Sequence, residues 1–251
     1  MSTQQISKVL RGNVGLLCGS VATILFVLGL FGLSSRIPIV AAESANVLPA
    51  ASEAAPASPA DGLQTVVLAG GCFWGVQAVF QHVEGVTQAV SGYAGGSMPN
   101  PTYGQVSSGQ TGHAESVQVT FDPGKISYGK ILQIFFSVAH DPTQLDRQGP
   151  DVGTQYRSAI FFSNESEKRV AQSYIKQLGG AAAFSRPIVT RIDPLTKFYP
   201  AEAYHQNYAL THPDQPYIVY NDLPKVENLK RVFADIYREQ PVIVATMHRG
   251  P

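Results

Sequence analysis

The chain of 251 residues has little cysteine and no excess of either charge. Cysteine occurs only at Cys18 and Cys72, which excludes a disulfide framework and any zinc site that needs several thiolates. Eighteen basic residues balance eighteen acidic ones, which argues against the basic surface of a nucleic-acid-binding domain. The question of function therefore narrows to one thiol in the body of the chain, Cys72.

The N-terminal part of the chain has the pattern of an export segment. Lys8 and Arg11 precede an uncharged, mostly apolar run at 14–33, which contains Cys18. A run of about 20 residues is long enough to cross a membrane as a helix, whereas the small residues at 40–42 are typical of a signal-peptide cleavage site. We therefore predict that residues 1–42 form a signal peptide or a membrane anchor. The rest of the chain is then exported to the periplasm or another extracytoplasmic space, since positive residues near the start stay cytoplasmic.

The composition then changes to Ala, Pro, Ser and Glu between residues 43 and 62. Such a segment buries too little apolar surface to offset the entropy of ordering it. We predict a linker at 43–62, a catalytic domain at 63–240 and a C-terminal tail at 241–251.

Predicted strands and helices alternate along the catalytic domain. Alternation of apolar and polar residues indicates strands, and apolar residues three and four apart indicate helices. This order favours a two-layer α/β (α+β) sandwich with a mixed sheet. The predicted strands are 65–69, 86–93, 115–121, 159–162 and 188–192, and the predicted helices are 73–83, 126–139, 165–178 and 226–238.

Cys72 lies at a predicted turn from a strand into a helix, directly after Gly70 and Gly71. The glycines allow a sharp turn and a close approach of substrate to the backbone. A helix N-terminus lowers a cysteine pKa, and the thiolate is the nucleophile, so we predict a reactive Cys72. Phe73 and Trp74 follow at once and offer an apolar wall beside the thiol.

Three further segments carry candidate site residues. Glu115 opens an apolar strand, and if its side chain points into a pocket, burial raises its pKa and makes it a proton donor. Asp151 and Tyr156 lie in a polar stretch that runs into the next apolar strand, and Tyr103 is presented by a turn after Asn100. These four are candidate site residues beside Cys72, although a tyrosine alone is more often a packing residue.

Taken together, these segments resemble the type-A peptide methionine sulfoxide reductases over residues 66–228, nearly the whole domain. Any one of the motifs is weak evidence, but the same motifs in this order and spacing are specific. They are Gly-Gly-Cys-Phe-Trp at 70–74, Gly-Tyr-Ala-Gly-Gly at 92–96, Asn-Pro-Thr-Tyr at 100–103, Thr-Gly-His-Ala-Glu at 111–115, Gly-Thr-Gln-Tyr-Arg-Ser at 153–158 and Tyr-His-Gln-Asn-Tyr at 204–208.

The resemblance implies a mechanism. The Cys72 thiolate attacks the sulfoxide sulfur, and protonated Glu115 gives a proton to the oxygen with help from Tyr103 and Tyr156. Methionine leaves, and Cys72 becomes a sulfenic acid. The resemblance further implies that Phe73 and Trp74 hold the substrate methyl group, while Asp151 helps to position the pocket. It also implies the S epimer of free and protein-bound methionine sulfoxide as substrate, with no metal or organic cofactor.

The chain lacks the resolving cysteine that the family pattern usually includes. Many members have a resolving cysteine at the position of Ser107, and others have cysteines near the C-terminus, but nothing after Cys72 is cysteine here. An external thiol must therefore reduce the Cys72 sulfenic acid, and the partner we expect is glutathione, a glutaredoxin or a thioredoxin-like protein.

Two other functions fit the same residues. One is a thiol hydrolase or acyltransferase in which His205 or His113 activates Cys72, and which forms an acyl-enzyme from esters or amides. The other is a membrane-tethered binding domain without catalytic activity. The product formed on Cys72 distinguishes the first from a reductase, and Cys72→Ser distinguishes the second.

Overall fold

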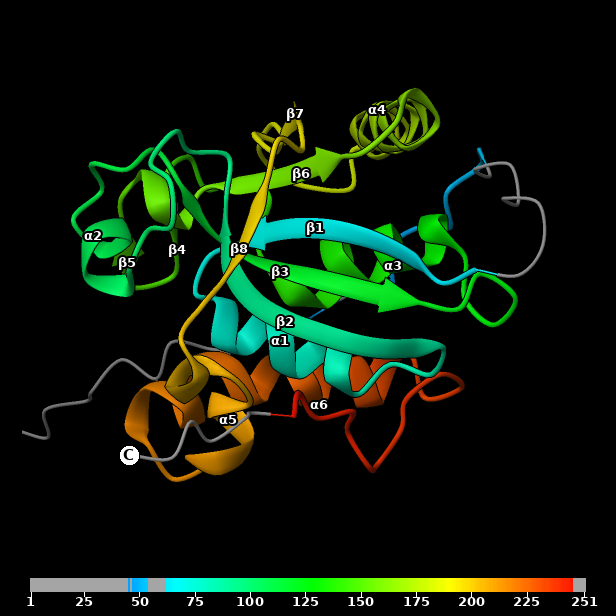
Figure 1. Ribbon diagram of the computed structural model, residues 1–251. Helices are drawn as coiled ribbons and strands as arrows, with labels where there is room; N and C mark the ends of the chain where they lie inside the picture. Colours follow the sequence, from blue (N-terminus) through cyan, green and yellow to red (C-terminus); the bar gives the residue numbers. More distant parts are fainter. Residues whose placement is uncertain (1–44, 46, 54–61, 246–251) are drawn as a thin grey trace, which may run out of the picture. The chain divides into compact units, whose positions relative to one another are not determined.

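A six-stranded mixed sheet forms the centre of the protein, in this computed structural model that describes residues 45, 47–53 and 62–245 (Figure 1). Its strand order is β7-β6-β1-β3-β2-β8, in which only β6 and β7 run parallel. The predicted mixed sheet is thus confirmed. The strands are β1 (Gln64–Gly70), β2 (Val86–Ala94), β3 (Ala114–Phe121), β6 (Ser158–Phe162), β7 (Arg191–Pro194) and β8 (Phe198–Pro200), and β4 (Arg147–Gln148) pairs with β5 (Asp151–Val152) in a separate hairpin.

The two faces of this sheet bury different amounts of apolar surface. Along β1, Val66 and Leu68 belong to the large core cluster, whereas Val67 and Ala69 belong to a small second cluster on the other face. This follows from the period-two alternation of side chains along a strand. The large core lies between the sheet and the helices, which is the two-layer arrangement expected from the sequence.

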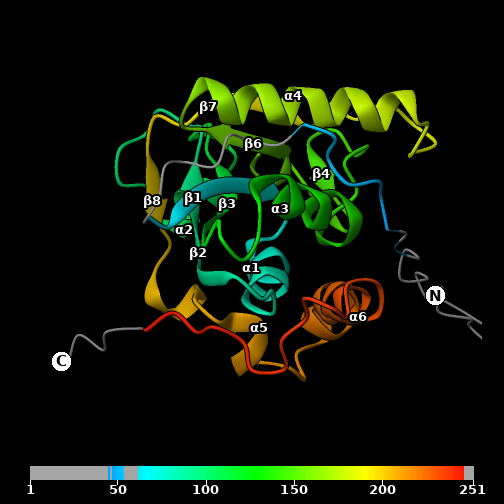
Figure 2. The same cartoon turned by 90° about the vertical axis from the view of Figure 1, so that its right-hand side faces the viewer.

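The helices cover the face of the sheet that carries the large core. α1 packs on β1, β2 and β3 and contacts α6 on its other side, so α1 lies between the sheet and α6 in Figure 2. α4 packs on β6 and β7 and contacts α3. The α-helices are α1 (Phe73–Gln81), α2 (Tyr103–Ser107), α3 (Tyr128–Ile134), α4 (Glu165–Gly180), α5 (Tyr208–Thr211) and α6 (Leu223–Val232), with the π-helical segments η1 (Phe135–Ala139) and η4 (Ile218–Asp222) and the 3₁₀ turns η2 (Thr154–Tyr156) and η3 (Ala203–His205).

The ends of three neighbouring strands, β6, β1 and β3, lie together at one end of the sheet. Because β1 is antiparallel to β3 and β6, the last residue of β1 lies beside the first residues of the other two; Gly70 pairs with Ser158. On the far side of β3, Glu115 pairs with Tyr93 of β2. The segments near residues 72, 115 and 157, which are far apart in the chain, therefore lie close together at this end of the sheet.

Several element boundaries differ from the sequence prediction. The terminal helix was predicted at 226–238, but α6 begins at Leu223, with Pro224 in its first turn where the missing amide hydrogen costs little, and ends at Val232. The strand predicted at 188–192 lies at Arg191–Pro194, where it pairs with β6. α2 was predicted only as a turn, since a helix of five residues has no apolar period to detect.

Part of the predicted linker contacts the folded domain. Leu48 is buried, its carbonyl accepts a hydrogen bond from Gln133, and the Pro49 carbonyl accepts one from Tyr174 of α4. Glu53 forms an ion pair with Arg169. Composition alone predicts a tether here, but the backbone of Leu48, Pro49 and Ala50 is bonded to side chains of the domain, so this part of the predicted linker packs on it.

The predicted C-terminal tail is also held to the domain over its described part. The backbone of Val242 donates to Gln81, and Val244 exchanges two hydrogen bonds with the side chain of Asn207. The predicted signal peptide or anchor at 1–42, with Cys18 in it, lies outside the described residues. Among the helices of the described part, none is long and apolar enough to span a membrane.

Candidate active site

Cys72 occupies the N-cap of α1, two residues after the end of β1. The turn that brings it there depends on Gly71, whose φ of 87° lies in the region that favours glycine. A Cβ atom on Gly71 would also overlap the side chain of Gln148 from the β4–β5 hairpin. The predicted strand-to-helix turn is thus confirmed. The thiol is buried, with 7% of the residue exposed.

The predicted low pKa of Cys72 is wrong for this structure. Burial raises the pKa of the thiol well above its usual value, and the carboxylates of Glu115 and Asp222, when they are ionised, raise it further. A hydrogen bond from the Trp74 amide and the charge of Lys225 act in the opposite direction, but they are smaller. The sequence shows the helix N-terminus that favours a thiolate, but not the carboxylates that fold against it.

Glu115 is buried at the start of β3, with 2% of the residue exposed. Its Oε2 accepts a hydrogen bond from the backbone amide of Phe73 at 3.0 Å, which places the carboxyl group beside the first turn of α1. Burial raises the pKa of Glu115 to about 8, and the charges of Asp151 and Asp222 contribute to the increase. Glu115 therefore carries its proton at neutral pH, as predicted for an acid.

Asp151 lies on β5 and accepts a hydrogen bond from the hydroxyl of Tyr217, directly before η4. This bond joins two segments that are 66 residues apart in the chain. Burial raises the pKa of Asp151, although the bond from Tyr217 and the charge of Lys225 oppose the change. The charge of Asp151 in turn raises the pKa of Glu115. That Asp151 helps to position the pocket stays a prediction.

Tyr103 and Tyr156 approach the same site from two short helical turns. Tyr103 is the first residue of α2, where its backbone amide donates to Glu202 at 2.9 Å. Tyr156 ends η2 and is partly buried. Burial raises the pKa of both phenols, and the charges of Glu115 and Asp151 raise them further. Both hydroxyl groups therefore stay protonated and are available as hydrogen-bond donors.

Phe73 and Trp74 form part of an aromatic cluster beside Cys72. The Trp74 ring stacks on Tyr208 with 3.9 Å between centroids, and its Nε1 donates to Nδ1 of His205 at 3.2 Å. The Phe73 ring lies 6.3 Å from that of Tyr103. These contacts fix both side chains of the predicted apolar wall.

Sequence reasoning missed an ion pair that the fold brings to the site. Asp222 ends η4 with 0% of the residue exposed, and its Oδ1 lies 3.4 Å from Nζ of Lys225. The motif at 204–208 was a signal for His205 and Tyr208, but the segment at 217–225 has no local pattern that indicates chemistry. Its side chains reach the site only because η4 packs on α1.

The alternative base His113 is fully engaged elsewhere. Its Nδ1 accepts a hydrogen bond from Gly96, and its Nε2 lies 2.8 Å from the carbonyl of Met98. His113 therefore holds the loop that contains Gly96 and Met98.

The described residues contain no group of three or more His, Cys, Asp or Glu side chains that could hold a metal ion.

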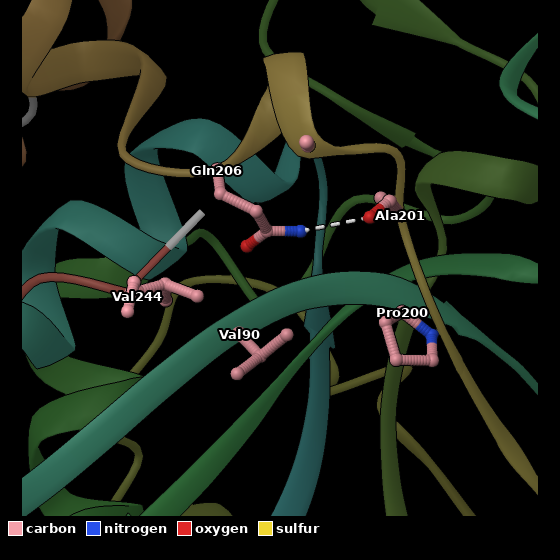
Figure 3. A pocket seen from close by; sticks show the side chains of 7 residues that line it. Val90, Pro200, Ala201, Gln206 and Val244 are labelled. Atoms are coloured by element: carbon pink, nitrogen blue, oxygen red, sulfur yellow. Dashed lines mark hydrogen bonds between the residues drawn. The ribbon is translucent and has the colours of Figure 1, made fainter. Parts of the chain in front are cut away.

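A cavity of about 190 Å³ lies away from these residues, between β2, the segment after β8 and the irregular segment at 244–245 (Figure 3). Gln206 borders it, but its amide is already bonded to Ser91, Gln77 and Ala201. Because its polar lining is satisfied and none of the candidate site residues borders it, this cavity is a packing feature. It is lined by Val90, Pro200, Ala201, Ala203, Gln206, Val244 and Ala245.

Comparison with known sequences gives one consistent result. Residues 64–236 match the family model described as peptide methionine sulfoxide reductase. The chain is 59% identical over 185 residues to peptide methionine sulfoxide reductase MsrA 2 of Mesorhizobium japonicum, covering 74% of this chain and 95% of that protein. It is 49% identical over 175 residues to peptide methionine sulfoxide reductase MsrA of Thermus thermophilus, covering 70% of this chain and 98% of that protein.

Solved structures lead to the same family. Methionine sulfoxide reductase A of Corynebacterium diphtheriae superposes with a TM-score of 0.53 at 32% identity, covering 68% of this chain and 87% of that one. The reduced form of Mxr1 from Saccharomyces cerevisiae superposes with a TM-score of 0.55 at 33% identity, covering 63% of this chain and 90% of that one.

Proposed function

The chain belongs to the peptide methionine sulfoxide reductase family and is thus an oxidoreductase that reduces methionine sulfoxide, and we propose that it does so through Cys72 with Glu115 as acid. The observation that carries this proposal is the hydrogen bond from the Phe73 amide to Glu115, because it sets a protonated carboxyl group beside the turn that presents the thiol. Reduction of methionine sulfoxide in proteins repairs oxidative damage.

The proton on Glu115 and the proton on Cys72 have separate roles in this step. Sulfoxide oxygen is a poor leaving group until it is protonated, so Glu115 gives its proton to the oxygen as Cys72 attacks the sulfur. Because Cys72 is buried and its pKa is raised, its thiol still carries a proton, and the Glu115 carboxylate then receives that proton. The hydroxyl group ends on Cys72 as a sulfenic acid, methionine leaves, and no net proton is taken up. Tyr103 and Tyr156 donate hydrogen bonds to the oxygen as charge develops on it.

Substrate binding is proposed to depend on the aromatic cluster. Phe73 and Trp74, held by Tyr208 and His205, offer an apolar surface for the terminal methyl group. Asp151, tied to Tyr217, positions the polar side of the pocket. With the methyl group on one side and the proton donors on the other, only one epimer at sulfur places its oxygen on the donors, and we propose the S epimer.

The sulfenic acid is proposed to be reduced from outside the chain. No cysteine follows Cys72, and Ser107 stands where many family members have their resolving cysteine. Two thiols of a donor reduce the sulfenic acid to the Cys72 thiol, with release of water and formation of one disulfide in the donor. Glutathione, a glutaredoxin and a thioredoxin-like protein are the donor classes that fit. The step needs neither a metal nor an organic cofactor.

A single turnover without a thiol donor is expected to leave Cys72 heavier by one oxygen atom. Intact-protein and peptide mass spectrometry after incubation with methionine sulfoxide measures this gain, which each donor of a panel should then reverse. An unmodified Cys72, or a Cys72 acylated by an added ester, would instead support the thiol hydrolase. A matched control is methionine in place of its sulfoxide, which should leave the mass unchanged.

We propose, from the sequence pattern at 1–42, that the enzyme acts in the periplasm or another extracytoplasmic space, anchored through residues 14–33 if the segment is not cleaved. Cell fractionation of the full chain is expected to place it with the membrane or the periplasmic fraction. Mass analysis of its N-terminus separates a cleaved signal, ending near residue 42, from an intact anchor. Recovery in the cytoplasm with residues 1–42 intact would contradict the proposal.

A further inference from the structure

Glu202 lies directly before η3 and accepts two hydrogen bonds through its carboxylate. Oε1 accepts from the backbone amide of Tyr103 at 2.9 Å, and Oε2 accepts from the hydroxyl of Tyr93 at 2.8 Å. The two donors lie 99 and 109 residues away along the chain. Burial by itself would raise the pKa of Glu202, but the hydrogen bonds that it accepts lower it overall, so the side chain is an ionised acceptor at neutral pH.

The position of Glu202 is itself fixed by β2. The amide of Ala201 donates to the carbonyl of Ser91 at 2.9 Å, so the chain stays bonded to β2 where β8 ends. Tyr93, two residues further along β2, is fully buried and is paired in register with Glu115 of β3. The carboxylate of Glu202 is therefore tied to the strand beside the proposed acid.

α2 depends on contacts with the rest of the domain for its position. It has five residues, whereas isolated helices shorter than about 12 residues are marginal in water. The bond to Glu202 holds its first residue, Tyr103, and at its other end the carbonyl of Ser107 accepts from a side chain of η2. The ring of His205, at the end of η3, lies 4.3 Å from the ring of Tyr103. The segment that begins at Glu202 therefore contacts both the backbone and the ring of Tyr103.

We propose that Glu202 is a positioning residue that holds Tyr103 where its hydroxyl group donates to the sulfoxide oxygen. Glu202 touches no reacting atom and acts through the backbone of Tyr103, while Tyr93 fixes its second oxygen. A displacement of about 1 Å in a catalytic group can cost about 10²-fold in rate, so a bond that fixes the backbone of a donor affects kcat. The inference rests on the proposed role of Tyr103 in the reaction.

The test compares Glu202→Ala with Glu202→Gln in the full chain, each with and without Tyr103→Phe. Glu202→Ala removes both acceptors and should lower kcat by about tenfold, with a much smaller change in KM. Glu202→Gln should recover most of this activity, because its amide oxygen accepts from the Tyr103 backbone and its amide nitrogen donates to the Tyr93 hydroxyl. Residues that act as a unit are not additive, so Glu202→Ala should lower kcat by less than about twofold in the Tyr103→Phe background.

A merely structural role for Glu202 gives a different result. It would lower the melting temperature and reduce kcat by the same factor with and without the Tyr103 hydroxyl, and that result would overturn the proposal. A Glu202→Gln variant as slow as Glu202→Ala would overturn it as well, since the charge and not the accepted bonds would then matter. Glu227→Ala is the matched control, because Glu227 is an exposed carboxylate on α6, and it should leave kcat and KM in place.

If Glu202→Ala does not fold, Tyr93→Phe takes its place in the same comparison. This change keeps the buried ring and removes only the bond to Oε2 of Glu202. It should lower kcat less than Glu202→Ala would, and by a factor that disappears in the Tyr103→Phe background. An equal loss in both backgrounds would contradict the inference.

Hydrogen exchange of the Tyr103 amide tests the contact with Glu202 independently of activity. Exchange should be faster in Glu202→Ala and unchanged in Glu202→Gln, as measured by mass spectrometry on peptides that cover α2. Unchanged exchange in Glu202→Ala would refute the inference and leave the reductase mechanism as it stands. Full activity in Tyr103→Phe would instead remove Tyr103 from the proposed mechanism, and the inference with it.

Discussion

Cys72→Ser is expected to reduce turnover of methionine sulfoxide to the level without enzyme, because a hydroxyl group at this position lacks the nucleophilicity of sulfur. Its sulfur is also the atom that accepts the oxygen, so no other group of the site replaces it. The measurement is methionine formed per enzyme with a chemical dithiol as donor, which removes the natural donor from the comparison.

The fold should survive this change. Cys72 is the N-cap of α1 and makes no capping hydrogen bond through its side chain, whereas serine is among the preferred N-cap residues. We therefore expect a melting temperature equal to or above that of the unchanged protein. Cys18→Ser is the matched control and should keep full activity. Retained turnover in Cys72→Ser would end the reductase mechanism proposed for this residue.

Glu115→Gln is expected to lower kcat by about 10²–10⁴-fold, the usual contribution of general acid catalysis, with a much smaller change in KM. The amide oxygen of glutamine can still accept the bond from the Phe73 amide, so the local geometry is kept. What is lost is the transferable proton. Steady-state kinetics over a range of methionine sulfoxide concentrations separate the two parameters, and an effect on KM alone would assign Glu115 to binding.

The pH dependence provides a second check on Glu115. The pKa of about 8 in the folded protein is above the usual value of 4.5, so activity should fall as pH rises through 8. Between these two values the folded state binds one more proton than the unfolded state, so the free energy of unfolding contributed by this group falls as pH rises. Glu115→Gln should remove that part of the dependence, which denaturant titrations at pH 5 and pH 8 measure.

Local sequence patterns predicted the parts of the site that lie on or beside single elements. The glycines before Cys72 predicted the turn, and the alternation after Glu115 predicted β3, because both patterns involve neighbouring residues. Short elements were missed for the same reason: β8 has three residues and α2 has five. The linker prediction was also too simple at 47–53, since composition does not show that Tyr174 and Gln133 are placed to bond that backbone.

The sequence by itself determined the family, the alternation of strands and helices, and the identity of the thiol and its proposed partners. Ordered motifs at family spacing carry that information without coordinates. Only the tertiary structure decided the protonation of the site. A helix N-terminus alone suggests a lowered pKa for Cys72. Burial of the thiol, together with the charge of Asp222 from a segment 150 residues away along the chain, raises that pKa instead. The reason is that a pKa depends on solvent access and on charges brought near in space.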